Sequence, residues 1–194
     1  MTRDALDRYF TPRAAAQELL RELAPRLTET TYGYVVDPAA GRGALLDAAA
    51  LELPDYKWSE RVGYEIDADA AAYMRKHPHN VKEIDFLTAP SDGAMVDLYI
   101  SNPPYSLGQE FVQKMLDDRG PYSIVACLLR LGFLASQKRT EFWRANPPSA
   151  LRILSARPSF TGDGKTDNSD YAWYIWIPPE RRFGIATLGW YDGK

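Results

Sequence analysis

Seven residues from Asp37 to Gly43 have the composition of a turn that holds a ligand against the backbone. They read Asp-Pro-Ala-Ala-Gly-Arg-Gly and lie between a short apolar run and a stretch of good helix formers. The two glycines allow a tight turn and a close backbone approach where a side chain would collide with a ligand. Leu46 stands where the dinucleotide fingerprint would have its third glycine. The turn therefore does not indicate a nicotinamide-type pyrophosphate.

Two carboxylates follow this turn, each at the end of a predicted strand. Glu65 could accept hydrogen bonds from two ribose hydroxyls. Asp85 could pair with an adenine amino group while the base packs on the ring of Phe86. Each carboxylate alone is also consistent with a helix N-cap or a solvated strand end. Together with Asp37 they place acidic residues at three successive strand ends around a Gly-x-Gly turn, which favours a nucleoside-bearing cofactor.

The segment Asn102-Pro103-Pro104-Tyr105 follows another predicted strand. Its prolines make a stiff segment without N–H donors, so the acceptors point outward. An Asn oxygen and a rigid backbone carbonyl could hold both hydrogens of an exocyclic amine, and Tyr105 adds an aromatic face. A second Asn-Pro-Pro at Asn146 follows a charged helical run, and we interpret it as a helix stop and surface turn.

The elements that position these residues are strands alternating with helices. Strands are predicted over 34–37, 62–66, 81–86, 97–101, 122–129, 150–155 and 171–177. Helices are predicted from Pro12 to Leu27 and over 44–51, 69–76, 109–116 and 139–144. This alternation predicts an α/β fold with a mostly parallel sheet and helices on both faces. The last two strands lack a helix between them, which predicts an antiparallel hairpin at one edge. Ligands bind such sheets at the carboxyl ends of the strands, where the site residues lie.

Together these motifs resemble the S-adenosylmethionine-dependent amino-methyltransferases, especially the DNA N6-adenine methyltransferases. The resemblance rests on the 37–43 turn, on Asn102-Pro-Pro-Tyr105 and on Tyr9-Phe10-Thr11-Pro12, which is similar to that family's additional cofactor motif. The compact form, with Arg157-Pro-Ser-Phe160 and Asp170-Tyr-Ala-Trp173 in the last hairpin, is similar to small phage or prophage enzymes, including those of restriction-modification systems. The resemblance covers about residues 8–177 and implies a seven-stranded Rossmann-like methyltransferase fold.

The resemblance also implies a role for each motif residue. S-adenosyl-L-methionine, released as S-adenosyl-L-homocysteine, would be bound by Tyr9, Thr11, Pro12, Asp37, Pro38, Ala39, Gly41, Gly43, Glu65, Ile66, Asp85, Phe86 and Asn102. The catalytic set would be Asn102, Pro103, Pro104 and Tyr105. Two acceptors on the adenine amine draw its nitrogen toward tetrahedral geometry and stabilise the positive charge that develops during attack on the methyl group. Tyr105 would stack on an adenine flipped out of the duplex.

Charge is distributed unevenly along the chain. Residues 1–118 hold 12 basic and 20 acidic side chains, whereas residues 119–157 hold seven basic ones and only Glu141. This pattern favours a phosphate-bearing partner, although solvated charges that cluster by chance would look the same. We expect DNA phosphates to contact Arg130, Lys138, Arg139 and Arg144. We expect the polar loop 159–170 to read bases or to brace the flipped adenine with Phe160.

Composition narrows the class of protein. The 194 residues are 45% hydrophobic, which argues against disorder, and no apolar stretch reaches the roughly 18 residues that span a bilayer. We expect no membrane partner and a cytoplasmic location in a bacterial or phage-infected cell. Cys127 alone excludes an internal disulfide and a cysteine-built zinc site. With His77 and His79 as the only histidines, we expect no metal.

Several alternatives remain open at this level. Asn-Pro-Pro-Tyr also serves enzymes that methylate protein glutamines or amines in RNA, and a non-catalytic subunit could bind cofactor and DNA. We expect residues 1–194 to form one methyltransferase domain without a separate target-recognition domain, because 17 residues follow Ile177. Target choice would then come from loops or from a specificity partner, or there would be hardly any; the partners expected are DNA and a specificity partner or a second copy in a homodimer.

Overall fold

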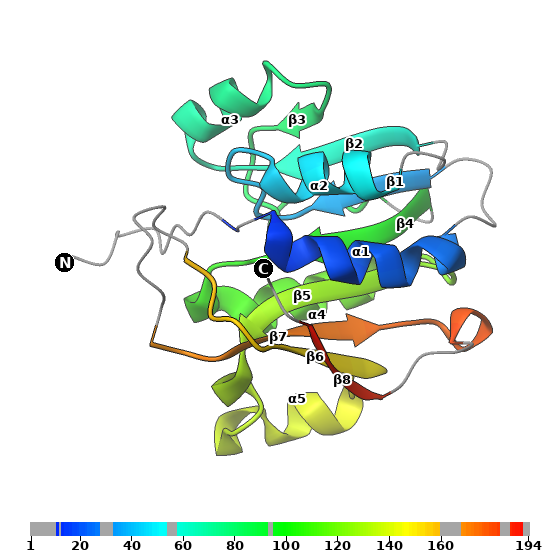
Figure 1. Cartoon of the computed structure of the whole chain (residues 1–194). Helices are drawn as coiled ribbons and strands as arrows, with labels where there is room; N and C mark the ends of the chain where they lie inside the picture. Colours follow the sequence, from blue (N-terminus) through cyan, green and yellow to red (C-terminus); the bar gives the residue numbers. More distant parts are fainter. Residues whose placement is uncertain are drawn as a thin grey trace.

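A single mixed sheet organises the part of the chain that the structure, a computed structural model, describes: residues 11, 13–27, 33–53, 58–92, 95–159, 168–182 and 187–191 (Figure 1). Its strands are β1 (Gly33–Asp37), β2 (Trp58–Tyr64), β3 (Asn80–Lys82), β4 (Val96–Ser101), β5 (Ile124–Arg130), β6 (Ala150–Leu154), β7 (Tyr171–Trp176) and β8 (Leu188–Tyr191). They follow the spatial order β3-β2-β1-β4-β5-β7-β6-β8. Strand β7 runs antiparallel to its neighbours β5 and β6, and the other pairings are parallel.

Helices cover both faces of this sheet (Figure 1). They are α1 (Ala14–Leu27), α2 (Ala44–Glu52), α3 (Ala68–Met74), α4 (Gly108–Asp118) and α5 (Thr140–Ala145), with short 3-10 turns η2 (Tyr105–Leu107), η3 (Leu131–Phe133), η4 (Gln137–Arg139) and η5 (Pro179–Arg181). Because successive strand residues face opposite sides, Leu98 packs with α1 and α2 whereas Tyr99 packs with α4 and α5. The sheet therefore has two cores, one on each face.

The predicted α/β class, the mostly parallel sheet and its antiparallel C-terminal strands are confirmed. The structure adds an eighth strand, β8, which pairs with β6 and extends the sheet beyond the predicted hairpin. Four residues that include Gly189 give a weak strand signal, so their pairing depends on the neighbouring strand. Strand β3 ends at Lys82 rather than at Phe86, because Ile84 N–H donates to the Lys82 carbonyl and turns the chain.

The order of the strands positions the site. Strands that follow β1 in the sequence lie on both sides of it, so the strand order reverses between β1 and β4 and leaves a crevice at their carboxyl ends.

Among the described residues, none of the helices is both long and apolar enough to cross a lipid bilayer.

Candidate active site

A cleft of about 290 Å³ lies at the point where the strand order reverses. Its walls come from the loops that follow β1, β2, β3 and β4. It is lined by nine of the residues that the sequence indicated: Pro38, Ala39, Gly41, Glu65, Ile66, Asp85, Phe86, Asn102 and Pro104. Segments far apart in the sequence thus meet at the predicted edge of the sheet.

The turn after β1 is held by the carboxylate of Glu65. Gly41 has a φ of 55°, a left-handed conformation that favours glycine, and its N–H donates to Glu65 Oε2 at 2.7 Å. The Asp67 N–H donates to Glu65 Oε1, also at 2.7 Å. Each carboxylate oxygen has a further lone pair. Glu65 can therefore still accept hydroxyl hydrogens from a ligand in the cleft.

Asp37 lies behind the cleft rather than in its lining. The side chain is buried, and its Oδ1 accepts hydrogen bonds from the Ala39 N–H at 3.1 Å and from the Ser101 hydroxyl at 2.9 Å. Burial raises the pKa of this carboxyl to about 7, although both hydrogen bonds act in the opposite direction. Asp37 thus ties the turn after β1 to the end of β4.

Phe86 belongs to the hydrophobic core and also lines the cleft. It is buried, with its ring edge-to-face against Tyr64 at 5.1 Å and stacked on Phe111 at 5.8 Å between centroids. Asp85 is exposed and accepts the Leu87 N–H at 2.9 Å. The exposed large apolar side chains in the lining are Ile66, Ile84 and Leu107.

Asn102 is the unusual residue of the site, because one of its buried side-chain atoms has no hydrogen-bond partner in the described structure. Its side chain is 8% exposed, and its Nδ2 donates to Thr11 Oγ1 at 2.9 Å. Its Oδ1 is buried and accepts no hydrogen bond within the described part of the chain. A buried polar atom left without a partner costs about 1–3 kcal/mol, so natural structures rarely leave one unless a ligand or water satisfies it. Asn102 lines the cleft, so a ligand bound there could supply the missing donor to Oδ1.

A second cleft, of about 630 Å³, begins at the next residues of the same segment. Tyr105 lines it, with its ring centroid 4.7 Å from the Arg130 guanidinium carbon and 5.5 Å from the Tyr171 ring. The other lining residues are Leu129, Arg130, Leu131, Gly132, Phe133, Arg139, Asn168, Ser169 and Asp170. Asn102 and Pro104 thus line one cleft and Tyr105 lines the other, whereas Pro103 is in neither lining.

The basic residues divide into two groups. Arg130 and Arg139 line the second cleft, whereas Lys138 and Arg144 are exposed outside it, and Arg144 pairs with Glu141 at 2.8 Å. Two further basic side chains of the 119–157 segment pair with carboxylates: Arg152 forms a buried ion pair with Glu22, and Arg157 pairs with Asp170. The net positive charge of residues 119–157 is therefore larger than the positive charge that lies near the clefts.

The residues that line the first cleft differ in part from those that the sequence indicated. Gly43 is not in the lining, and Tyr9, Pro12, Phe160 and the loop 160–167 lie outside the described residues. Sequence reasoning missed the lining residues Arg42, Tyr64, Asp67, Asp69, Ala70, Ile84, Leu107 and Phe111. Four of the eight, Arg42, Tyr64, Asp67 and Ile84, directly neighbour a predicted residue, so for these four the strand ends and the loops after them were the available signal. Ile84 was missed because the prediction placed it inside a strand.

No protein-family model matches the chain, and no curated protein does. Solved structures do resemble it. They include a class I S-adenosylmethionine-dependent methyltransferase from Listeria monocytogenes, with 15% identity and a TM-score of 0.71 over 96% of this chain and 67% of that one. A methyltransferase subunit of a type I restriction-modification system from Streptococcus thermophilus has 14% identity and a TM-score of 0.73 over 88% and 45%. An RNA methyltransferase from Pyrococcus horikoshii has 21% identity and a TM-score of 0.63 over 89% and 88%.

These likenesses show the fold, which is the Rossmann-like methyltransferase fold that the motifs implied. This chain spans less than half the length of the Streptococcus subunit. Proteins of this fold thus include a DNA-modification subunit and an RNA enzyme.

Proposed function

We propose that this protein transfers the methyl group of S-adenosyl-L-methionine to an amine, and specifically to N6 of adenine in DNA. The observation that carries the proposal is the buried Oδ1 of Asn102, an acceptor without a partner among the described residues, on the segment that lies between two clefts. An exocyclic amine is the donor that such an acceptor suits. The methyltransferase fold supports the type of reaction.

The first cleft fits the proposed cofactor. The glycine turn gives backbone access, Glu65 retains lone pairs for the ribose hydroxyls, and Ile66, Ile84 and Phe86 give an apolar wall for adenine. When bound, the cofactor supplies an electrophilic methyl group on a sulfonium. The residues named from the sequence as cofactor-binding remain proposals, with Asp37 assigned to positioning the turn.

Asn102 would act on the target amine rather than on the methyl donor. Its Oδ1 accepts one N–H, and a proline carbonyl of the rigid segment accepts the other. Its Nδ2 is already committed to Thr11 Oγ1, so the side chain is fixed with the oxygen as its acceptor. A preorganised acceptor favours the positive charge that develops on nitrogen and costs no reorganisation during the reaction.

The second cleft suits a base and its phosphates. Tyr105 offers a ring for stacking, and Arg130 and Arg139 supply positive charge beside it. Lys138 and Arg144 would contact more distant phosphates. The likeness to a DNA-modification subunit supports DNA, and a specificity partner or a second copy could contribute target choice.

The test is to incubate the protein with methyl-labelled S-adenosyl-L-methionine and, separately, with DNA, RNA and ribosomal proteins. We expect label in N6-methyl-2′-deoxyadenosine after digestion of the DNA. Label only in RNA nucleosides or in a protein glutamine would overturn the DNA assignment but keep the amine chemistry. Cofactor binding without transfer to any of the three would indicate a non-catalytic subunit.

A further inference from the structure

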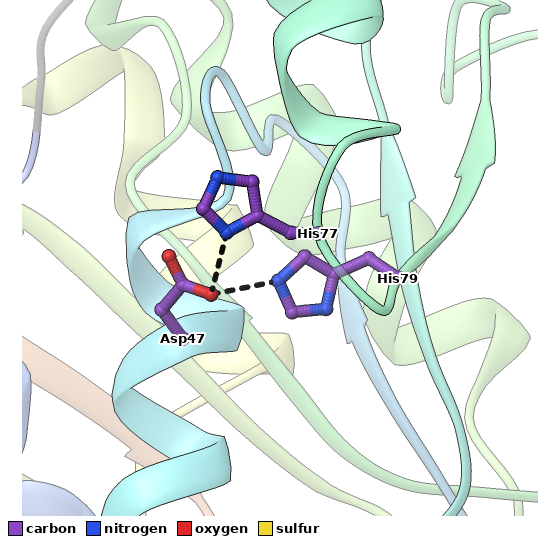
Figure 2. A group of neighbouring side chains, drawn as sticks. All are labelled: Asp47, His77 and His79. Carbon is purple, nitrogen blue, oxygen red and sulfur yellow. Dashed lines mark hydrogen bonds and ion pairs between the residues drawn. The ribbon is translucent and has the colours of Figure 1, made fainter.

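Three side chains with metal-binding atoms meet outside the linings of both clefts (Figure 2). Asp47 is in the first turn of α2, and His77 and His79 are in the loop between α3 and β3. Asp47 Oδ1 is 2.9 Å from His79 Nε2 and 3.7 Å from His77 Nδ1. Figure 2 shows both rings directing a nitrogen at this one oxygen. The three atoms lie within 4.8 Å of one another.

The two separations from Asp47 Oδ1 are close to those between the ligands of a metal ion. Zinc binds imidazole nitrogen at about 2.0–2.1 Å and carboxylate oxygen at about 2.0–2.2 Å, so ligands of a tetrahedral site lie about 3.3 Å apart. The separations of 2.9 and 3.7 Å bracket that value. The side chains of Asp47 and His77 are 35% and 34% exposed, which leaves a path for an ion and room for a water ligand. The His79 side chain is only 1% exposed and fixes one side of the site.

We propose that Asp47 Oδ1, His77 Nδ1 and His79 Nε2 bind a divalent transition-metal ion such as Zn²⁺. Two imidazoles and one carboxylate suit a borderline ion better than Mg²⁺ or Ca²⁺, which prefer sites made of oxygen ligands. The sequence-based expectation of no metal rested on the scarcity of histidines, but the fold brings both of them to one carboxylate. This proposal does not depend on the proposed methyltransferase activity.

The ion would join the start of α2 to the loop after α3. His79 packs against Gly43, since its Cδ2 lies 3.3 Å from the position that a Cβ on Gly43 would take. Gly43 has a φ of 85° and ends the turn that lines the first cleft. Metal binding would therefore stabilise this turn from behind, away from the ligand side.

Arg61 contacts His79 in a way that disfavours metal binding, so replacing Arg61 tests the proposed metal site. Its Nε donates to His79 Nδ1 at 3.4 Å, so in the metal-free protein the ring carries its proton on Nε2 and donates it to Asp47. An ion on Nε2 moves the ring proton to Nδ1, and Arg61 must then withdraw. The Arg61 guanidinium keeps a second acceptor, the Pro78 carbonyl, at 3.2 Å. Replacing Arg61 should therefore strengthen metal binding.

The experiment titrates untagged, metal-free protein with Zn²⁺ by calorimetry and follows thermal unfolding with and without the ion. We expect one ion per chain, a dissociation constant on the order of micromolar or tighter, and a Zn²⁺-dependent rise in the melting temperature. Asp47→Asn and His77→Gln should each weaken binding at least tenfold and abolish the thermal shift. Arg61→Met should tighten binding. Co²⁺ should give the visible absorption of a four-coordinate site in the natural protein and lose it in Asp47→Asn and His77→Gln.

The matched control is Asp117→Asn, an exposed carboxylate change on α4, on the other face of the sheet. It removes the same charge and should leave Zn²⁺ binding unchanged. Far-ultraviolet circular dichroism verifies that each variant is folded, and His79 is kept because its buried ring packs in the core. Absence of binding by the natural protein, or binding that survives both Asp47→Asn and His77→Gln, would overturn the proposal.

Discussion

Two Asn-Pro-Pro segments occur in this chain, and the sheet separates them. Asn102 follows the carboxyl end of β4, whereas Asn146 precedes the amino end of β6. Strands β4, β5 and β6 run in the same direction, because β5 is parallel to β4 and both β5 and β6 are antiparallel to β7. The two segments therefore lie at opposite ends of the sheet.

Their polar groups are used differently. The N–H of Asn146 donates to the Phe142 carbonyl at 2.9 Å, its carbonyl accepts from Trp176 Nε1 at 3.1 Å, and its Nδ2 donates to Gln113 Oε1 at 3.3 Å. Asn146 thus closes α5 and supports β7. The Oδ1 of Asn102, in contrast, is buried without a partner in the described structure.

A cleft alone does not distinguish the two segments. Asn146 and Pro147 line a third cleft of about 390 Å³, together with Pro178 and Pro179. What differs is the free acceptor and the end of the sheet on which it lies. The same tripeptide is a helix stop in one place and a candidate site in the other.

The largest expected effect separates the two asparagines. Asn102→Ala removes the proposed amine acceptor and should lower the rate of methyl transfer about 10²–10³-fold, as loss of one preorganised transition-state hydrogen bond commonly does. Asn146→Ala removes a helix-end contact and should lower stability without lowering the rate in the folded protein. Single-turnover kinetics measures both. Greater loss of rate in Asn146→Ala would reverse the assignment.

The next effect concerns Asp37, which anchors the end of the sheet that carries Asn102. Its pKa is about 7 in the folded protein against an ordinary value of 3.8, so the folded state binds the proton more strongly than the unfolded state. Stability is then fully present below about pH 4 and is lost as the pH rises through about 7, by about 2–4 kcal/mol.

Asp37→Asn should remove this contribution while keeping an acceptor for the Ala39 N–H and the Ser101 hydroxyl. Urea denaturation at pH 5 and pH 8 measures the difference. The natural protein should lose more stability than the variant between these two values. Equal losses would contradict the raised pKa.

A smaller effect is expected at the turn that faces Asn102 across the first cleft. Gly41→Val introduces a branched side chain where φ is 55° and where the proposed cofactor contacts the backbone, so S-adenosyl-L-methionine affinity should fall at least tenfold. Gly132→Val is the control, because Gly132 has similar open space but lines the second cleft. Calorimetry with unchanged cofactor affinity in folded Gly41→Val would remove the cofactor from this cleft.

The smallest effect is a change in salt dependence. Arg130 lies over Tyr105 beside the first segment, whereas Arg119 lines the third cleft beside the second. Arg130→Gln should reduce the slope of log affinity for DNA against log salt by about 0.9, the value for one lost phosphate contact, and Arg119→Gln should not change it. The opposite pattern would place DNA at the other end of the sheet.

Much of the fold follows from the sequence because it depends on local patterns. The alternation of apolar runs and helix formers predicts seven of the strands, and the positions of Asp37, Glu65 and Asn102 at strand ends predict the edge where they meet. The second Asn-Pro-Pro is separated from the first by the same reasoning, since Asn146 follows a helix rather than a strand.

What the sequence does not predict depends on contacts between distant segments. Arg152 is buried against Glu22, which lies 130 residues away, so the charge pattern alone could not assign it to structure. Asp37 turns behind the cleft because the Ser101 hydroxyl, 64 residues later, holds it there. His77 and His79 approach Asp47 only because the loop after α3 folds back on α2.

The proposed function requires that Asn102 Oδ1 accepts a hydrogen from the target amine. A double-mutant cycle tests it directly: Asn102→Ala is combined with removal of the amine, by placing purine in the position of the single adenine in a short DNA strand. Binding is measured with S-adenosyl-L-homocysteine present. We predict that the natural protein prefers adenine, that Asn102→Ala does not, and that the coupling energy is about 1 kcal/mol or more, within the usual range for residues in contact. Strictly additive effects of the two changes would show that Asn102 does not contact the amine, and would contradict the claim.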